Sequence, residues 1–77
     1  MVISFKPDGS QFASGCRDKT IKIWNNKTYK EERVLHGHSD NVVSICYDHD
    51  GTLLASASAD HTIRIWNTEN YKIEYVL

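Results

Sequence analysis

The chain has 77 residues, of which 40% are hydrophobic and 25% are charged, and its formal net charge is -1 at pH 7. This composition is typical of a soluble globular protein, and the small net charge gives no electrostatic basis for binding nucleic acid or an anionic membrane. No apolar run approaches the roughly 20 residues of a membrane-spanning helix. The N-terminus does not resemble a signal peptide, and the two cysteines, Cys16 and Cys46, stand apart in the sequence. We therefore expect an intracellular protein of the cytoplasm or nucleus.

Eight short runs of apolar or alternating residues, separated by turn signals, are predicted to be β-strands. In chain order they cover residues 2–5, 11–15, 20–24, 29–35, 42–47, 53–57, 62–66 and 71–77. Asp8-Gly9 and Asp50-Gly51 mark tight turns, because glycine readily adopts the positive φ that such turns need. No segment of helical length carries an apolar stripe of period 3.6, so the pattern predicts an all-β fold.

The chain is an internal repeat. Residues 1–35 align with residues 43–77 at a constant offset of 42, and 16 of these 35 pairs are identical. We expect a first unit at 1–35 and a complete second unit at 36–77, because the segment His36–Val42 has no counterpart in the first copy. Four antiparallel strands repeated every 40–45 residues are typical of a propeller blade. The prediction is two four-stranded antiparallel blades of a partial β-propeller.

The second copy carries Gly37-His38, Asp50-Gly51 and the run TIRIW at 62–66, and the first copy carries TIKIW at 20–24. In these motifs the chain resembles the WD-repeat β-propeller family, over essentially its whole length. The asparagines that follow the tryptophans, Asn25 and Asn67, stand where the family has aspartate. This substitution keeps an acceptor oxygen but removes its charge.

The resemblance implies a hydrogen-bonded tetrad in the second unit. Its members would be His38, Ser56, Asp60 and Trp66, with the carboxylate, imidazole, hydroxyl and indole N–H bonded in that order. The first unit would keep a three-member remnant of this tetrad, consisting of Ser14, Asp18 and Trp24.

A serine, a histidine and an aspartate in one network also occur in hydrolase active sites. Ser56 lies in the middle of an apolar run and Ser14 has no histidine partner, whereas a nucleophile must be exposed. We therefore predict a structural network, no catalytic residue and no enzyme activity. Structural zinc sites usually have paired ligands at short spacing, and the two cysteines fall at unrelated points of the repeat, so we also predict no metal and no cofactor. The cysteines are expected to be small buried or half-buried residues.

The resemblance implies a non-catalytic platform for protein–protein interaction within a multiprotein assembly. An alternative is the substrate- or cargo-recognition part of an enzyme complex in which another subunit is catalytic. Direct nucleic-acid binding is disfavoured by charge. Loops on a rigid scaffold often carry binding, and exposed arginine is enriched at interface hot spots, which favours Arg17. The candidate partner-binding rim consists of Arg17, Lys19, Ser39, Asp40, Asn41 and His61.

Two blades cannot cover their own outer faces, because each repeat needs a neighbour on both sides. We therefore expect the chain to be either a piece of a longer propeller or a unit that assembles with copies of itself. Three or four chains would supply six to eight blades, within the usual range of about 4–8.

Overall fold

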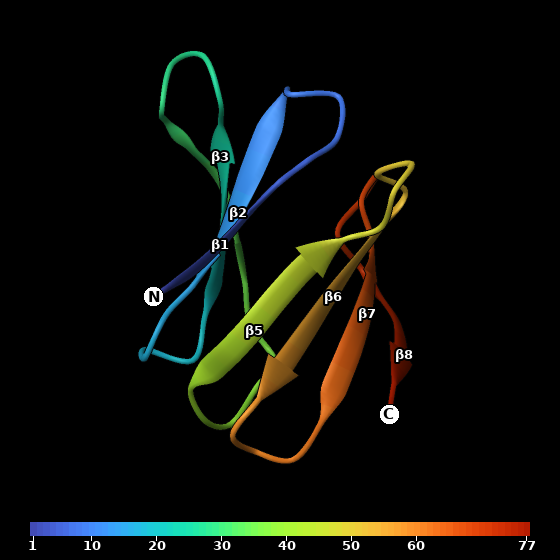
Figure 1. Ribbon diagram of the computed structural model, residues 1–77. Coiled ribbons are helices and arrows are strands. Elements are labelled where there is room, and N and C mark those ends of the chain that lie inside the picture. Colours follow the sequence, from blue (N-terminus) through green and yellow to red (C-terminus); the bar gives the residue numbers. More distant parts are fainter.

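The computed structural model describes residues 1–77 and contains two four-stranded antiparallel sheets, each a meander (Figure 1). The first sheet consists of β1 (Val2–Phe5), β2 (Gln11–Gly15), β3 (Ile21–Asn25) and β4 (Glu31–Leu35). The second sheet consists of β5 (Val42–Tyr47), β6 (Leu53–Ser58), β7 (Ile63–Asn67) and β8 (Ile73–Val76). The predicted all-β fold with two four-stranded sheets is confirmed. The fold contains no helix with the length and apolarity needed to cross a membrane.

The fourth strand of each sheet begins two residues later than predicted. Tyr29 and Tyr71 have φ values of 59° and 53°, which places both in the left-handed region. Their amides donate hydrogen bonds to the carbonyl oxygens of Asn25 and Asn67, at 2.9 and 2.6 Å. These bonds close a turn after β3 and after β7. The sequence pattern of residues 29–35 and 71–77 is compatible with a strand throughout. At the first two residues of each segment, however, the hydrogen bonds of the turn determine the backbone conformation.

The third strands begin one residue later than predicted. Thr20 donates its amide and its hydroxyl to the carboxylate of Asp18, and Thr62 donates in the same way to Asp60. Short side chains that bond to nearby backbone groups compete with the strand ladder. Each threonine therefore belongs to the turn rather than to the strand.

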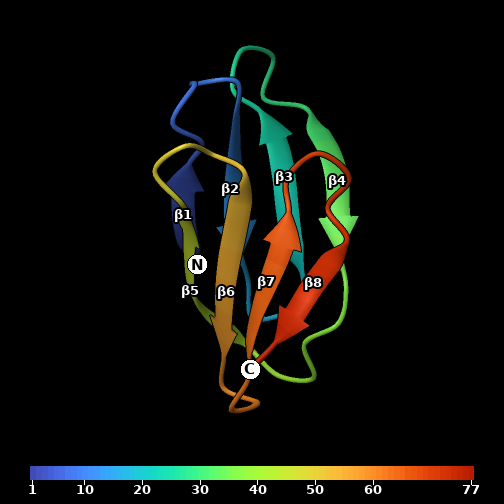
Figure 2. The ribbon, with the colours of Figure 1, turned by 90° about the vertical axis from the view of Figure 1, so that its right-hand side faces the viewer.

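The two sheets pack face to face, with β5 of the second sheet against β1 of the first (Figure 2). Among the hydrogen bonds that cross between them are those from the Tyr47 amide to the Ser4 hydroxyl at 3.2 Å and from the Val42 amide to the Cys16 carbonyl at 3.3 Å. One hydrophobic core lies between the sheets and is formed by Ala13, Ile21, Ile23, Leu35, Val42, Ile45, Tyr47, Leu54, Trp66 and Tyr71.

Gly15 permits the close approach of the sheets near this core. A Cβ atom at Gly15 would lie 2.6 Å from Cγ1 of Val42 and 3.0 Å from Cγ2 of Val2. Both distances are too short for carbon atoms in contact, since optimal separations are about 3.5–4.0 Å. Any side chain at this position would push β5 away from β2.

Each sheet leaves its other face uncovered. The first-sheet outer face presents Ile3, Phe5, Phe12, Trp24 and Tyr29. The second-sheet outer face presents Cys46, Leu53, Ile63, Ile65 and Tyr75. Cys46 is exposed there, so the prediction of a buried or half-buried thiol is wrong for Cys46, although Cys16 is half-buried. Cys46 alternates along β5 with the core residues Ile45 and Tyr47, and its side chain therefore points away from the first sheet.

Candidate functional site

The structure brings the side chains of His38, Ser56, Asp60 and Trp66 into one network. His38 precedes β5, Ser56 lies in β6, Asp60 in the β6–β7 turn and Trp66 in β7. Asp60 Oδ2 lies 3.1 Å from His38 Nδ1, and His38 Nε2 lies 2.7 Å from Ser56 Oγ. The indole N–H of Trp66 donates to Ser56 Oγ at 2.9 Å. The network therefore ties the segment before β5 to β6, to β7 and to the turn between them.

Every hydrogen in this network has an acceptor when His38 is neutral and carries its hydrogen on Nδ1. Nδ1–H then donates to Asp60, and Nε2 accepts the Ser56 hydroxyl hydrogen, which leaves Ser56 Oγ free to accept from Trp66. A doubly protonated imidazole would leave the Ser56 hydroxyl hydrogen without an acceptor in the network. The geometry thus fits the neutral imidazole.

Asp60 accepts further hydrogen bonds that favour its ionised form. The Thr62 hydroxyl and amide donate to Oδ1 at 2.6 and 2.9 Å, and the Ser39 amide donates to Oδ2 at 3.0 Å. Hydrogen bonds to a carboxylate stabilise its charge. These donors, led by the Thr62 hydroxyl, hold the pKa of Asp60 far below its ordinary value.

A pH dependence of stability follows from the lowered pKa of Asp60. An aspartate whose folded-state pKa lies below its unfolded value of about 3.9 stabilises the fold above that pH, and this contribution is lost as the pH falls further. The difference in unfolding free energy between the wild type and Asp60→Asn should therefore be largest at neutral pH and should shrink below about pH 4. Urea unfolding of both proteins at several pH values measures this difference. A difference that stays constant with pH would contradict the assignment.

The first sheet reproduces only part of the network. The indole N–H of Trp24 donates to Ser14 Oγ at 2.9 Å, as Trp66 does to Ser56. Asp18 bonds to Thr20 and does not reach Ser14. The structure therefore joins Ser14 with Trp24 and leaves Asp18 as part of a turn.

The predicted rim residues lie at one end of the two sheets, in three loops tied together by two backbone hydrogen bonds and by one bond to the Asp60 carboxylate. The Cys16 carbonyl accepts from Val42, the Asn41 carbonyl accepts from Ala59, and Asp60 accepts from the Ser39 amide. Of the rim residues, Asn41 is half-buried, and the exposed ones are Arg17, Lys19, Ser39, Asp40 and His61.

Two cationic side chains of the rim have no partner within the molecule. The side chains of Arg17 and Lys19 form neither a hydrogen bond nor an ion pair. Lys19 and His61 have φ values of 74° and 70°, so both turns present these residues from a left-handed backbone. Asx-type turns around Asp18 and Asp60 hold the loops in place. The rim is thus a fixed loop surface with free charges.

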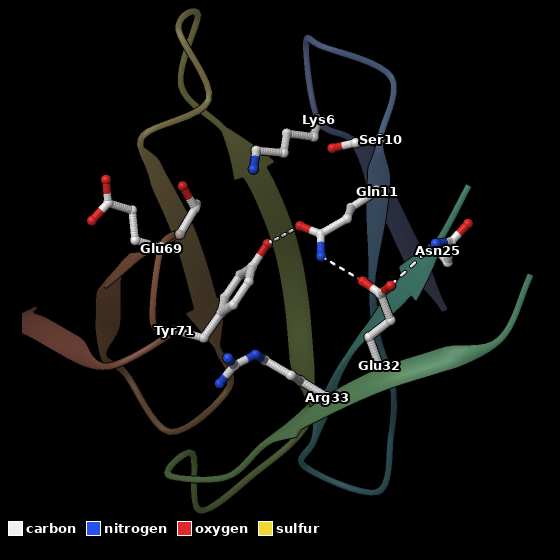
Figure 3. A pocket seen from close by; sticks show the side chains of 9 residues that line it. Lys6, Ser10, Gln11, Asn25, Glu32, Arg33, Glu69 and Tyr71 are labelled. Carbon is white, nitrogen blue, oxygen red and sulfur yellow. Dashed lines mark hydrogen bonds between the residues drawn. The ribbon is translucent and has the colours of Figure 1, made fainter. Parts of the chain in front are cut away.

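A second polar network connects the two sheets at the opposite end, and no sequence pattern predicted it (Figure 3). The hydroxyls of Tyr47 and Tyr71 lie 3.0 Å apart, and the Tyr71 hydroxyl donates to Gln11 Oε1 at 2.8 Å. The Gln11 amide then donates to Glu32 Oε1 at 2.6 Å, and the guanidinium of Arg33 lies 5.7 Å from the centre of the Tyr71 ring. Burial raises the pKa of both tyrosines. We call these five residues the inter-sheet clasp.

The clasp borders a polar cleft of about 620 Å³ between the sheets. Lys6, from the β1–β2 loop, and Glu69, from the β7–β8 loop, both line this cleft (Figure 3). The Gln11 hydrogen bond lowers the pKa of Glu32 below its ordinary value, so this carboxylate is ionised at neutral pH. No group of three or more histidine, cysteine or acidic side chains has an arrangement that would hold a metal ion.

The hydroxyl of Tyr71 lies at the centre of the clasp, and its removal is expected to destabilise the fold. Tyr71→Phe should lower the unfolding free energy by about 1–2 kcal/mol, because the Tyr47 hydroxyl and Gln11 Oε1 each lose a buried partner. The repeat supplies a matched control, since Tyr29→Phe alters the equivalent but exposed side chain and should change stability very little. Urea unfolding measures both variants, and equal effects would contradict the role of the clasp.

The pair Tyr29/Tyr71 was visible in the sequence as an identity of the repeat, but the partners of Tyr71 were not. Gln11 aligns with Leu53, and Arg33 aligns with Tyr75, so the clasp does not repeat. The only sequence signal of the clasp was that these positions differ between the two copies. The sequence does not show that the side chains meet, because their contact depends on how the two sheets pack.

Comparison with known proteins identifies the repeat. The family model described as "WD domain, G-beta repeat" matches residues 1–25 and 29–67. The general transcriptional corepressor TUP1 of Saccharomyces cerevisiae is 38% identical over 45 residues, which cover 58% of this chain and 6% of TUP1. Myosin heavy chain kinase C of Dictyostelium discoideum is 41% identical over 33 residues, which cover 43% of this chain and 4% of the kinase.

Solved structures show the same architecture. The crystal structure of the RRP9 WD40 repeats superposes on 99% of this chain with a TM-score of 0.94 and 28% sequence identity, and the chain covers 23% of that structure. The chain thus spans a small part of each protein that it resembles. Its two sheets are WD-type blades, and the chain belongs to the WD40 repeat family.

Proposed function

We propose that this chain is a non-catalytic platform for protein–protein interaction in a multiprotein assembly, with residues 36–77 as its complete blade. One observation carries the proposal. Ser56, the only hydroxyl in an Asp–His–Ser arrangement, is 1% exposed, and its oxygen is held between His38 and Trp66. Neither cavity of the structure is lined by Ser56, so a substrate has no path to this hydroxyl.

The rim supports the proposal as the contact surface. Arg17 and Lys19 are exposed, and no internal hydrogen bond or ion pair competes for their charges. Asp40 is exposed on the neighbouring loop, and the backbone hydrogen bonds described above hold that loop in position. A binding surface that is ordered before contact loses less entropy when a partner docks. Other proteins are therefore the expected partners.

We place the protein inside the cell. Cys16 and Cys46 are both free thiols, which fits a reducing compartment. The name of TUP1, a general transcriptional corepressor, favours the nucleus over the cytoplasm.

Affinity capture from cell extract tests the platform role. The double variant Arg17→Ala/Lys19→Ala should reduce recovery of specific partners at least tenfold, since interface arginines often contribute more than about 1.4 kcal/mol. The control is Lys27→Ala/Lys30→Ala, which removes two exposed cations from the β3–β4 turn at the other end of the sheet. Equal recovery of partners with both variants would contradict the assignment of the rim as the contact surface. Labelling of folded protein at Ser56 by a reactive-serine probe would contradict the non-catalytic role.

A second candidate is the substrate- or cargo-recognition part of an enzyme complex. The similarity to myosin heavy chain kinase C, a protein named as an enzyme, favours it. Mass spectrometry of the captured proteins separates the two candidates. A stoichiometric enzyme subunit among them would support recognition for an enzyme, and its absence would leave the platform role.

A further inference from the structure

Arg64 carries a charge that no other group of the molecule neutralises. Its Nε atom is buried and has no hydrogen-bond partner, and no other buried side-chain nitrogen or oxygen is left in this condition. The guanidinium forms neither an ion pair nor a cation–π contact. A buried donor without an acceptor destabilises a fold, and native structures satisfy almost all such groups. Contacts within the chain therefore do not explain why an arginine stands at this position.

Arg64 lies in β7 on the face that packs toward the first sheet. Trp66, two residues further along β7, belongs to the core, so both side chains point to the same face. On this face Arg64 reaches the segment between β4 and β5. A Cβ atom at Gly37 would lie 2.8 Å from Nη1 of Arg64. The absence of a side chain at Gly37 thus lets the guanidinium lie against the backbone of this segment.

Two uncovered apolar side chains of β8 lie on the same face as Arg64. Val76 pairs directly with Arg64, and Ile73 pairs with Trp66. Ile73 is 41% exposed and Val76 is 52% exposed, whereas Arg64 is half-buried. The Cβ atom placed at Gly37 would also lie 3.6 Å from Cδ1 of Ile73, so Ile73 and Arg64 border the same backbone segment. We call Arg64, Ile73 and Val76 the Arg64 patch.

The repeat shows that the second copy lacks an acid that the first copy carries. At the offset of 42, Arg64 corresponds to Lys22 and Ile73 corresponds to Glu31. The first copy thus has a cation and a carboxylate at these two positions. The second copy keeps the cation and has an apolar side chain in place of the carboxylate. The charge of Arg64 is therefore available to an acid from another molecule.

We propose that the Arg64 patch binds an aspartate or glutamate side chain of a partner protein that has apolar residues next to this acid. The two Nη groups of Arg64 donate to the two carboxylate oxygens, a bidentate geometry that arginine often adopts. Ile73 and Val76 contact the apolar neighbours of the acid. A further blade would not cover the patch by packing, because the face that carries Arg64 already has the first sheet as its neighbour.

The patch adds a partner chemistry to the proposed platform role, and it rests on that role for the choice of a protein as the occupant. It shares no residue with the rim. The test of the patch uses the purified chain and defined peptides, whereas the test of the rim uses cell extract. Failure of one proposal is therefore distinguishable from failure of the other.

The Nε–Hε resonance of Arg64 in a ¹⁵N-labelled chain reports binding directly. The probe is the peptide N-acetyl-Leu-Glu-Leu-amide, and the matched probe N-acetyl-Leu-Gln-Leu-amide keeps its shape but removes its charge. The acidic peptide should shift this resonance in a saturable way. It should bind at least about tenfold more tightly than the uncharged peptide, because charge-assisted hydrogen bonds are roughly twice as strong as neutral ones.

Ile73→Glu gives the sharpest test, because it places the acid of the first copy beside Arg64. The new carboxylate should pair with the guanidinium and lower the affinity for the acidic peptide at least about tenfold. Without peptide, it should also move the Arg64 resonance in the direction of the peptide-bound wild type. Ile73→Gln removes the apolar side chain without adding a charge and should lower the affinity less.

Two further variants test the guanidinium itself. Arg64→Lys keeps the charge but loses the planar fork of donors, so it should also bind the acidic peptide more weakly than the wild type. Lys22→Gln changes the equivalent position of the first sheet and should leave the affinity unchanged. Far-UV circular dichroism checks that each variant folds.

Three results would overturn the proposal. Equal shifts with the two peptides would contradict a carboxylate as the occupant. A saturable response to inorganic phosphate, at concentrations where the acidic peptide gives none, would assign the patch to a phosphate group instead. Undiminished binding to folded Ile73→Glu and Arg64→Lys would place the contact elsewhere on the chain.

Discussion

Replacing Trp66 by alanine is expected to lower the unfolding free energy by about 3–5 kcal/mol, the usual cost of truncating a buried tryptophan. Trp66 is 3% exposed and belongs to the core between the sheets. Its indole N–H is also the terminal donor of the network, so truncation leaves a cavity and removes one hydrogen bond to Ser56. Urea unfolding followed by far-UV circular dichroism measures the loss without depending on tryptophan fluorescence.

The repeat supplies the control for this prediction. Trp24→Ala removes the same side chain from the equivalent position and breaks the equivalent hydrogen bond, to Ser14. Trp24 is only half-buried, on the first-sheet outer face, and no histidine completes its network. We expect the unfolding free energy to fall by at most about 2 kcal/mol, because the side chain of Trp24 buries less apolar surface than that of Trp66. Equal losses for the two tryptophans would contradict the argument.

His38→Ala is expected to cost about 2–4 kcal/mol, because it combines a cavity with an unsatisfied buried hydroxyl. The His38 side chain is 1% exposed, and it is the only acceptor for the Ser56 hydroxyl hydrogen in the network. It also supplies one of the donors to Asp60. The matched control is His36→Ala, two residues earlier and exposed, which should change stability by less than about 0.5 kcal/mol.

A double-mutant cycle shows whether His38 and Trp66 act through one network. Trp66→Phe removes the indole donor but keeps an aromatic ring in the core. If Ser56 couples the two residues, the losses for His38→Ala and Trp66→Phe should deviate from additivity by at least about 0.5 kcal/mol. Strictly additive losses would mean that the observed hydrogen bonds do not cooperate.

Much of the fold could be predicted from the sequence, because the deciding interactions are local and repeat. The β1, β2 and β5 strands were predicted with the bounds that the structure shows. The errors occurred where side chains and turns compete with the strand, as at Thr20 and Thr62. They also occurred at Tyr29 and Tyr71, where a left-handed residue closes a turn that the polar–apolar pattern does not reveal.

The candidate site shows a similar division. The residues of the tetrad could be named from a family resemblance, and the structure brings them within hydrogen-bonding distance. The remnant in the first sheet was predicted with three members, but Asp18 bonds only within its own turn. The clasp was not predicted, since its five residues come from both sheets, and the repeat does not conserve Gln11, Arg33 and Tyr47.

The sequence by itself determined the number and order of the strands and the repeat unit, because hydrophobic pattern, turn residues and spacing act within a few residues of each other. Only the tertiary structure decided which copy of each repeated residue is buried. Tyr29 and Tyr71 are identical in type and in local conformation, yet one is 68% and the other 6% exposed. The physical reason is that burial depends on a neighbouring sheet, and a repeated sequence does not state on which side its neighbour lies.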